Sequence, residues 1–301
     1  MGTVIHPGVA RSATSLLQRC LFARHPKLLC LGAPYNEATL ALRQELLKPE
    51  GYFNASKVRH VLASLDVYGD KTSVLSDEVL SGNYWTRATI ARRLAEFFPD
   101  ATVIFTIRSQ VQIVQSFYAS HGRVLKGVPP PYQGRHVTFH NWWSHAVDNF
   151  DSSFLGRLDY DRTIGIYEDA FGLDRVRVLL FEELTTDMPA FARRLAEILD
   201  IRAADIEELL AGQRVNPRDA AWLVRCHALR AKFLPNVRLR RLVPFGNALQ
   251  RRLEGLLTQG GPFRFEIPPR TVRQLEPLYR ESNRRLAERH ELPLATYGYP
   301  L

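Results

Sequence analysis

The chain has 301 residues, 46% of them hydrophobic, and a formal net charge of +9 at pH 7. This length and apolar content exclude a disordered chain and allow one large α/β domain or two small ones. The three cysteines form neither a disulfide framework nor a paired metal-ligand spacing, and no segment reads as a leader or a membrane span, so we expect a cytoplasmic protein.

Apolar, β-branched runs alternate with helical patterns along the chain, which is typical of βαβ units in a mostly parallel sheet. Helical spacing of apolar residues is clearest over Ser15–Phe22 and Thr86–Phe98, and the chain is mainly helical from Asp187 onward. Strands are expected at residues 3–6, 28–32, 72–76, 102–108 and 175–181. The predicted fold is α/β: a P-loop-like parallel β-sheet flanked by helices, with a helical basic C-terminal region, in a single domain over residues 1–301.

The first strand leads through small residues into a helix. After Thr3–His6 comes a turn at Pro7-Gly8, and the loop then opens an apolar helix on which Cys20 is expected to be buried. Such a connection binds phosphate because backbone N–H groups and the helix dipole both favour an anion. A Walker A loop has Gly-Lys-Ser/Thr four residues after its first glycine, but here Thr14 stands in place of the lysine and the only cation is Arg11. The pattern predicts a phosphate-binding loop that does not hydrolyse ATP.

A second arginine and a serine follow a later strand. Arg108 ends the strand at 102–108, at the carboxyl edge where open α/β sheets bind ligands. Ser116 lies about two turns into the following helix, so the two side chains could converge on one anion. Taken alone, this spacing is also common for a surface arginine and a helix serine.

Two further segments have distinctive compositions. Residues 122–150 contain three consecutive prolines and a cluster of aromatic and histidine residues, which indicates an insertion over the sheet. In it, Trp142 and Trp143 would form a sugar-stacking wall or, more simply, pack a helix on the core. Residues 214–252 contain ten Lys or Arg and one acid, Asp219. This basic region would attract a polyanion or an anionic membrane surface, or it is a solvated basic helix pair. We find no nucleic-acid recognition signature.

These motifs together resemble the sulfotransferases that use 3′-phosphoadenosine 5′-phosphosulfate, in particular their bacterial and carbohydrate-modifying branches. The family loop has the form Gly-x-x-Lys/Arg-Ser/Thr-Gly-Thr-Thr/Ser, and its second motif is an Arg followed eight residues later by a Ser. The matching positions here are Gly8, Arg11, Ser12, Thr14, Ser15, Arg108 and Ser116. Residues 171–184 are similar to the family's last strand, and the acidic residue that ends this strand usually has a structural role. Residues 279–286 and 297–300 are similar to the tail of bacterial members. Ala13 departs from the family's glycine, at a cost of about 1–2 kcal/mol if its φ is positive.

The resemblance implies a sulfuryl donor and a hydroxyl acceptor. The donor would be 3′-phosphoadenosine 5′-phosphosulfate, the product adenosine 3′,5′-bisphosphate, and no metal would be required. The residues that would hold the nucleotide are Gly8, Val9, Ala10, Arg11, Ser12, Ala13, Thr14, Ser15, Arg108 and Ser116. We expect a carbohydrate or glycolipid acceptor, with peripheral association at the inner membrane surface through the basic region; nothing in the sequence indicates an oligomeric state.

An acceptor alcohol needs a general base. Glu78 follows a buried strand directly and is expected at the same sheet edge as Arg108, and bacterial sulfotransferases often have a similar Ser-x-Glu there. Asp77 is the adjacent alternative, although it also suits a helix N-cap. His6 and His121 are further candidates. Arg11 would bind the 5′-phosphate and stabilise charge on the leaving group.

Two other classes of protein are compatible with the sequence. One is a P-loop nucleotide kinase or NTPase, which the loop topology allows and the missing lysine disfavours. The other is a non-catalytic protein that binds polyanions or membranes and has a degenerate nucleotide-binding fold. In that case Ala13, in place of the family's glycine, would mark a loop that no longer binds a nucleotide.

Overall fold

The computed structural model describes residues 2–65, 69–121, 137–213 and 265–301, with the side chains of residues 120 and 121 also left out. It contains two compact units, one made of residues 1–110, 156–215 and 275–301 and the other of residues 111–155 and 216–274. The single domain expected from the sequence stays a prediction.

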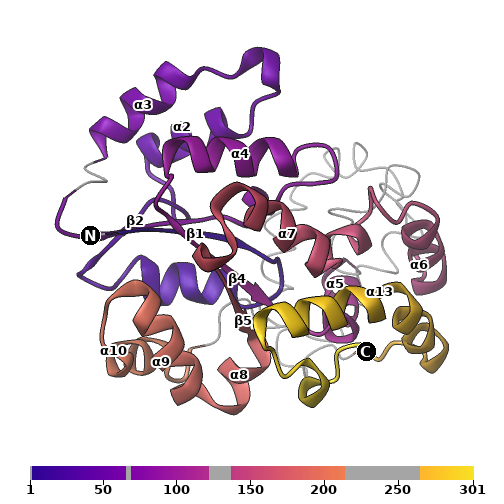
Figure 1. The fold of residues 1–301 in the computed structure, drawn as a ribbon. Helices are drawn as coiled ribbons and strands as arrows, with labels where there is room; N and C mark the ends of the chain where they lie inside the picture. The colour runs from indigo at the N-terminus through magenta and orange to yellow at the C-terminus, as the bar shows by residue number, and fades with distance from the viewer. Residues whose placement is uncertain (1, 66–68, 122–136, 214–264) are drawn as a thin grey trace, which may run out of the picture. The chain divides into compact units, whose positions relative to one another are not determined.

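The first unit contains a five-stranded sheet in the order β2-β3-β1-β4-β5, in which every neighbouring pair is parallel (Figure 1). All five strands predicted from the sequence are present. Their bounds are Thr3–Gly8 for β1, Leu28–Cys30 for β2, Thr72–Ser76 for β3, Thr102–Ile107 for β4 and Val176–Leu180 for β5. The predicted α/β class is therefore confirmed.

The turn expected at Pro7-Gly8 is wrong. β1 continues through both residues, and the next amide, that of Val9, donates to the Thr106 carbonyl at 2.9 Å. Pairing with β4 shifts in register between Ile5 and Gly8, so the strand absorbs the proline as an irregularity at its end. A proline is tolerated there because the irregular pairing does not require its missing N–H.

Helices connect the strands as βαβ units require. The helix predicted at Ser15–Phe22 is present as a short α-helix followed by a π-helical turn, and the one predicted at Thr86–Phe98 is present as α4. The described helices are α1 (Thr14–Leu16), η1 (Leu17–Phe22), α2 (Glu37–Leu46), η2 (Glu50–Tyr52), α3 (Ala55–Ser64), η3 (Glu78–Ser81), α4 (Arg87–Phe97), α5 (Gln110–His121), α6 (Phe139–Asp148), η5 (Leu155–Arg157), α7 (Tyr160–Phe171), η6 (Leu173–Arg175), α8 (Phe181–Thr186), α9 (Met188–Leu199), α10 (Ala203–Leu210), α13 (Pro269–His290) and η8 (Leu294–Tyr297).

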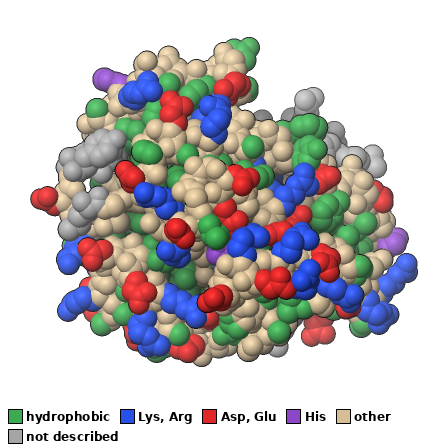
Figure 2. Space-filling view, in the orientation of Figure 1, with side chains coloured by type: hydrophobic (Ala, Val, Ile, Leu, Met, Phe, Trp, Pro, Cys, Tyr) green, Lys and Arg blue, Asp and Glu red, His purple; other side chains and the backbone are tan. Residues whose placement is uncertain are grey.

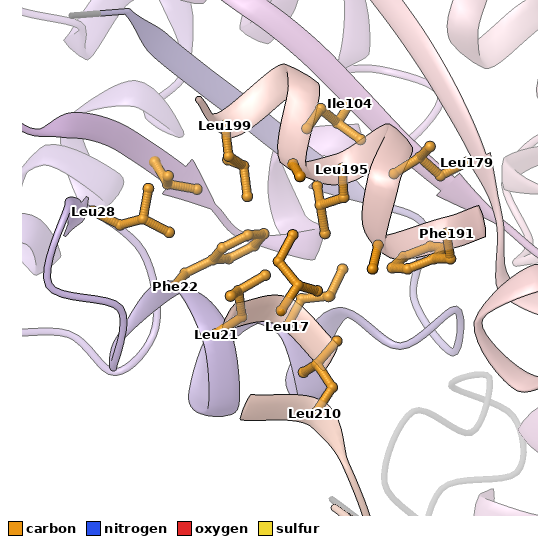
Figure 3. Packing of buried hydrophobic residues seen from close by; sticks show 14 of the residues in the cluster. Leu17, Leu21, Phe22, Leu28, Ile104, Leu179, Phe191, Leu195, Leu199 and Leu210 are labelled. Carbon is orange, nitrogen blue, oxygen red and sulfur yellow. The ribbon is translucent and has the colours of Figure 1, made fainter. Parts of the chain in front are cut away.

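One face of the sheet is covered by η1, α9 and α10, and a cluster of buried hydrophobic residues packs there (Figure 3). Leu17, Leu21 and Phe22 of η1 meet Phe191 and Leu195 of α9, and all five are buried. Cys20 is also buried in this cluster, as the helical pattern predicts. Full burial of such side chains is worth about 1.5–3 kcal/mol each, so this layer holds the first helix, and the loop before it, against the sheet.

The opposite face is covered by α4 and α7 (Figure 1). Tyr167 of α7 is fully buried, packs edge-on against Phe105 of β4 with ring centroids 5.1 Å apart, and donates its hydroxyl to the Leu80 carbonyl. Because side chains alternate along a strand, neighbouring β4 residues serve the two layers: Ile104 faces η1 and α9, whereas Phe105 faces α7.

The second unit contains an aromatic cluster around α6. Trp142 and Trp143 are only 2% and 5% exposed. Trp142 stacks on Phe154 at 4.6 Å, and the indole N–H of Trp143 donates to Gln274 at 2.8 Å. The two tryptophans are therefore core residues of their unit, and the interpretation as a sugar-stacking wall is wrong. Residues 122–136 of the expected insertion lie outside the described part of the chain.

Charges on the described surface are mixed in sign. On the face shown in Figure 2, basic and acidic side chains lie next to one another, notably over α13. Arg284 pairs with Glu281 and Glu288 along that helix, and Arg289 pairs with Asp161 of α7. The basic region at 214–252 falls outside the described residues. None of the described helices combines the length and apolarity needed to cross a membrane.

Gly32, just after β2, should be irreplaceable by a larger residue. A Cβ at this position would lie 2.0 Å from the Ser76 carbonyl oxygen at the end of β3, whereas a Cβ at Gly51 would have no heavy atom within 4 Å. We expect Gly32→Ala to lower the free energy of unfolding by about 2–3 kcal/mol or more, since backbone must move, and Gly51→Ala to change it by less than about 1 kcal/mol. Urea unfolding of both variants measures this; equal stabilities would contradict the contact.

Candidate active site

The loop between β1 and α1 has an unusual backbone. Gly8, Arg11 and Ala13 have φ values of 111°, 73° and 69°. A Cβ on Gly8 would lie 3.4 Å from the Cα of Glu78, so the glycine allows the loop to approach the end of β3 closely. Ala13 is the N-cap of α1 and makes no side-chain cap. The Leu16 amide donates to the Ala13 carbonyl at 2.9 Å, but Ala13 offers no side-chain acceptor to the two amides before that of Leu16, and such a helix start suits an anion.

Ser12 holds the loop to β4. Its side chain is fully buried, and its hydroxyl contacts the Thr106 carbonyl at 2.5 Å and the Val9 carbonyl. The sequence placed Ser12 among the nucleotide-binding residues. In the structure its hydroxyl anchors the loop, and its backbone amide turns back to the Val9 carbonyl at 3.3 Å. Ser12 therefore holds the positions of its neighbours in the loop.

Glu78 lies directly beside the loop. It is the first residue of η3, immediately after β3, and its Oε1 accepts a hydrogen bond from the Thr14 hydroxyl at 2.5 Å. Thr14 is 2% exposed, whereas Glu78 is half-buried. The structure thus brings the predicted base and the helix start within one hydrogen bond and leaves Glu78 partly exposed.

Asp77 has a structural role. Its Oδ1 caps η3 by accepting from the Val79 amide at 2.9 Å, and its Oδ2 accepts from Arg43 Nε at 2.6 Å and from the Tyr35 hydroxyl. Burial, together with the hydrogen bond to Asp77, raises the pKa of Tyr35. With both oxygens engaged, Asp77 fits the helix-cap interpretation and not that of a base.

His6 lies in the centre of the sheet. Its Nδ1 is 2.8 Å from Ser76 Oγ on β3, and its Nε2 is 3.0 Å from Thr106 Oγ1 on β4. The ring is fully buried, and desolvation lowers its pKa to about 3. A neutral imidazole with both nitrogens bonded inside the protein is not a base for an external hydroxyl, so His6 is not the catalytic base.

The contacts of His6 extend into a buried polar chain that sequence analysis missed. Gln18 of η1 donates to the Ser76 hydroxyl and carbonyl at 3.2 Å each, and Thr106 Oγ1 is 3.3 Å from Ser12 Oγ. The chain Gln18–Ser76–His6–Thr106–Ser12 therefore links β3, β1 and β4 to the loop. The only signal in the sequence was the presence of polar residues near the carboxyl ends of three otherwise apolar strands.

Arg108 is positioned against the loop. Its Nη1 donates to the Arg11 carbonyl at 3.3 Å, and its guanidinium lies 4.2 Å over the ring of Phe181. The Tyr160 hydroxyl donates to the Arg108 carbonyl at 2.7 Å. The cation is thus held where the end of β4 meets the loop, with Arg11 exposed in the loop itself.

Glu182 is the acidic residue that follows the last strand, and its contacts are structural. One carboxylate oxygen accepts from the Ser109 amide at 2.9 Å and the other from the Tyr299 hydroxyl at 3.1 Å. Asn283 adds a second tie to the C-terminal tail, donating to the Pro300 carbonyl at 2.7 Å. Tyr299 of the tail therefore holds Glu182, which in turn holds the backbone amide just after Arg108.

Two predicted residues are not joined to this site by the structure. Ser116 is half-buried in α5 and belongs to the second unit, so its pairing with Arg108 stays a prediction. His121 is the last residue of α5, and its side chain lies outside the described part of the chain.

The fold is similar to that of a sulfotransferase from Alicyclobacillus acidocaldarius. The two structures have a TM-score of 0.59 and 15% sequence identity, over 99% of this chain and 98% of that one. The chain therefore has the sulfotransferase fold.

Two other solved structures are less similar. A sulfotransferase domain from the curacin biosynthetic pathway has a TM-score of 0.43 at 16% identity, over 71% of this chain and 78% of that one. Retinol dehydratase in complex with androsterone and the inactive cofactor PAP has a TM-score of 0.35 at 12% identity, over 95% of this chain and 80% of that one. No family model matches the sequence, and no curated protein matches it significantly.

The pKa of His6 predicts a pH dependence of stability. The folded ring has a pKa of about 3, against 6.5 for an ordinary histidine, so protonation favours the unfolded chain. The stabilising contribution of neutral His6 is complete above about pH 6.5 and is lost as the pH falls toward about 3, with a loss of about 2 kcal/mol at pH 5. We expect His6→Gln to abolish this part of the slope in urea unfolding between pH 7 and pH 5. His60→Gln, at an exposed histidine of α3, should leave the slope unchanged; a wild-type slope in His6→Gln would refute the assignment.

The positive φ of Ala13 predicts a stabilising substitution. Left-handed backbone costs an alanine about 1–2 kcal/mol, so we expect Ala13→Gly to raise the free energy of unfolding by about 1 kcal/mol. Ala10→Gly, in the same loop but without a positive φ, should give no increase. Thermal unfolding of the two variants makes the comparison, and a destabilised Ala13→Gly would show that the loop does not need this conformation.

Proposed function

We propose that this protein is a sulfotransferase that transfers the sulfuryl group of 3′-phosphoadenosine 5′-phosphosulfate to an acceptor hydroxyl. The observation that carries the proposal is the convergence of three features at the carboxyl edge of the sheet. The β1–α1 loop with its uncapped helix start, the Glu78 carboxylate bonded to Thr14, and the Arg108 guanidinium bonded to the Arg11 carbonyl all lie there. The sulfotransferase fold of the chain agrees with this function.

The loop residues suit the phosphosulfate end of the donor. Loop amides other than those of Val9 and Ser12, which donate to carbonyls of the protein, would bind its oxygens together with the start of α1. The exposed Arg11 would neutralise charge that develops as the 5′-phosphate leaves. Arg108, together with Ser116, would bind the 3′-phosphate. Cationic side chains can stabilise sulfuryl transfer because the transferring group carries less charge than a phosphoryl group, so we propose no metal ion.

Glu78 would act as the general base. As the acceptor oxygen bonds to sulfur, its proton passes to the carboxylate, and the bond between sulfur and the bridging oxygen breaks with its electron pair on the 5′-phosphate. The hydrogen bond from Thr14 fixes the carboxylate beside the loop. His121 remains the alternative base of this proposal. A carbohydrate or glycolipid acceptor is the class that the resemblance to carbohydrate-modifying sulfotransferases supports.

Nucleotide binding tests the donor site. Isothermal titration without magnesium should give micromolar affinity for adenosine 3′,5′-bisphosphate and much weaker affinity for ADP and ATP. Arg108→Ala and Ser116→Ala should each weaken binding at least tenfold, since each removes a charge-assisted contact worth about 1.5–3 kcal/mol. Arg175→Ala is the matched control, because the Arg175 side chain is 43% exposed and pairs with Asp100, whose side chain is 90% exposed. Absence of bisphosphate binding, or a preference for Mg-ATP, would overturn the proposal in favour of a kinase or a non-catalytic binder.

Replacement of the base separates catalysis from binding. Glu78→Gln should keep bisphosphate affinity within about threefold while lowering the rate of sulfuryl transfer by about 10²–10⁴-fold. The rate is measured as bisphosphate release with methyl glycosides as acceptors. The control is Glu96→Gln, at an exposed carboxylate of α4. An unchanged rate in Glu78→Gln would exclude it as the base.

A further inference from the structure

Residues 298–300 are bonded to the segment that follows Arg108. The Ser109 hydroxyl donates to the Gly298 carbonyl at 2.9 Å. The Tyr299 hydroxyl donates to one carboxylate oxygen of Glu182 at 3.1 Å, and the other oxygen accepts from the Ser109 amide at 2.9 Å. Directly and through Glu182, residues 298–300 therefore hold both the amide and the hydroxyl of Ser109, which is buried.

A buried pair of amide side chains holds the same residues in place. Gln110 donates to Asn283 Oδ1 at 2.8 Å, and Asn283 donates to Gln110 Oε1 at 3.2 Å and to the Pro300 carbonyl at 2.7 Å. Gln110 and Asn283 are both fully buried. Because buried polar groups are costly unless they are bonded, this pair keeps residues 298–300 next to the residues that follow Arg108.

Glu182 is a buried carboxylate that depends on these contacts. It lies in the first turn of α8, and it forms no ion pair with any residue in the part of the chain that the structure describes. Burial raises the pKa of Tyr299 and the charge of Glu182 raises it further, so the hydroxyl keeps its proton and donates it. Hydrogen bonds to an ionised group are strong. Loss of the Tyr299 hydroxyl would therefore leave one carboxylate oxygen buried without its donor.

The residues after β5 contact Arg108 through its side chain and through its neighbouring backbone. Phe181 immediately precedes Glu182, and the Arg108 guanidinium lies 4.2 Å over its ring. The Tyr160 hydroxyl adds a bond to the Arg108 carbonyl at 2.7 Å. A displacement of Glu182 would move the Phe181 ring and the Ser109 amide together. The direction of the Arg108 side chain therefore depends on the position of Glu182.

We propose that Tyr299 is a positioning residue for the nucleotide donor: through Glu182 it fixes the backbone beside Arg108, and so the direction from which Arg108 meets the 3′-phosphate. This inference rests on the proposed function, in which Arg108 binds that phosphate. Tyr299 itself does not touch the donor in this arrangement, because its effect passes through Glu182 and Ser109. Selectivity for a nucleotide that carries a 3′-phosphate then depends on residues 298–300.

Two nucleotides that differ only in the 3′-phosphate test the proposal: adenosine 3′,5′-bisphosphate and adenosine 5′-monophosphate. Both are titrated calorimetrically without magnesium, and the ratio of the two affinities measures what the 3′-phosphate contributes. We expect Tyr299→Phe, which keeps the buried ring, to weaken bisphosphate binding at least about threefold and to leave monophosphate binding within about twofold of the wild type. Arg108→Ala, which removes the cation itself, sets the upper limit of this loss.

A double variant shows whether Tyr299 acts through Glu182. Glu182→Gln should lower the same ratio of affinities, because it removes the charge that holds the Ser109 amide. Residues that act through one chain of contacts have non-additive effects. Tyr299→Phe combined with Glu182→Gln should therefore lose no more bisphosphate affinity than Glu182→Gln alone.

Tyr297→Phe is the matched control, because the Tyr297 hydroxyl makes no hydrogen bond in the described part of the chain; this variant should bind both nucleotides as the wild type does. Unchanged bisphosphate affinity in Tyr299→Phe, an equal loss for both nucleotides, or additive losses in the double variant would overturn the proposal. If the wild type binds the bisphosphate no more tightly than the monophosphate, the proposed donor site fails as well. A wild-type preference that survives Tyr299→Phe overturns the positioning role alone.

Discussion

The hydrogen bonds of a single buried histidine tie together the three strands on which the site depends. His6 on β1 bonds to Ser76 on β3 and to Thr106 on β4, and Thr106 in turn contacts Ser12 of the loop. Buried polar groups are costly unless they are satisfied, and here each ring nitrogen has a partner. The cost of breaking this chain therefore fixes the relative positions of the strand ends that carry the loop, Glu78 and Arg108.

The loop is held from several directions before any ligand binds. Ser12 anchors it to β4, Thr14 bonds to Glu78, and the apolar layer of η1, α9 and α10 fixes the helix that follows. Two non-glycine residues, Arg11 and Ala13, keep positive φ values in it. Strain of this kind persists only where the surroundings determine the backbone, and it is common at ligand-binding sites. A preorganised loop suits a reaction in which positioning and charge stabilisation do most of the catalysis.

Two groups of residues lie after different strands of the sheet. The loop after β1 and the arginine after β4 present cationic and amide groups, which suit the phosphates of a nucleotide. The turn after η3 presents the exposed Tyr84 and Trp85 rings, which meet edge to face, with the Arg162 guanidinium over the Tyr84 ring. Glu78 belongs to both, because it bonds to the loop and begins the η3 turn. This arrangement follows from parallel topology, in which the carboxyl ends of adjacent strands share one edge.

The sequence alone predicts the strands, the α/β class and the candidate loop. Hydrophobic alternation and β-branched runs depend on local chemistry, and all five predicted strands are present. It misplaced the end of β1, because irregular pairing with β4 carries that strand through Pro7 to Gly8. It also could not assign His6, Asp77 and the tryptophans, since a polar or aromatic residue has the same letter whether it is buried or exposed. Only tertiary packing placed His6 between two strands, gave Asp77 to Arg43, buried Trp142 and left Trp85 exposed. These outcomes depend on contacts between residues far apart in the chain, which no local pattern records.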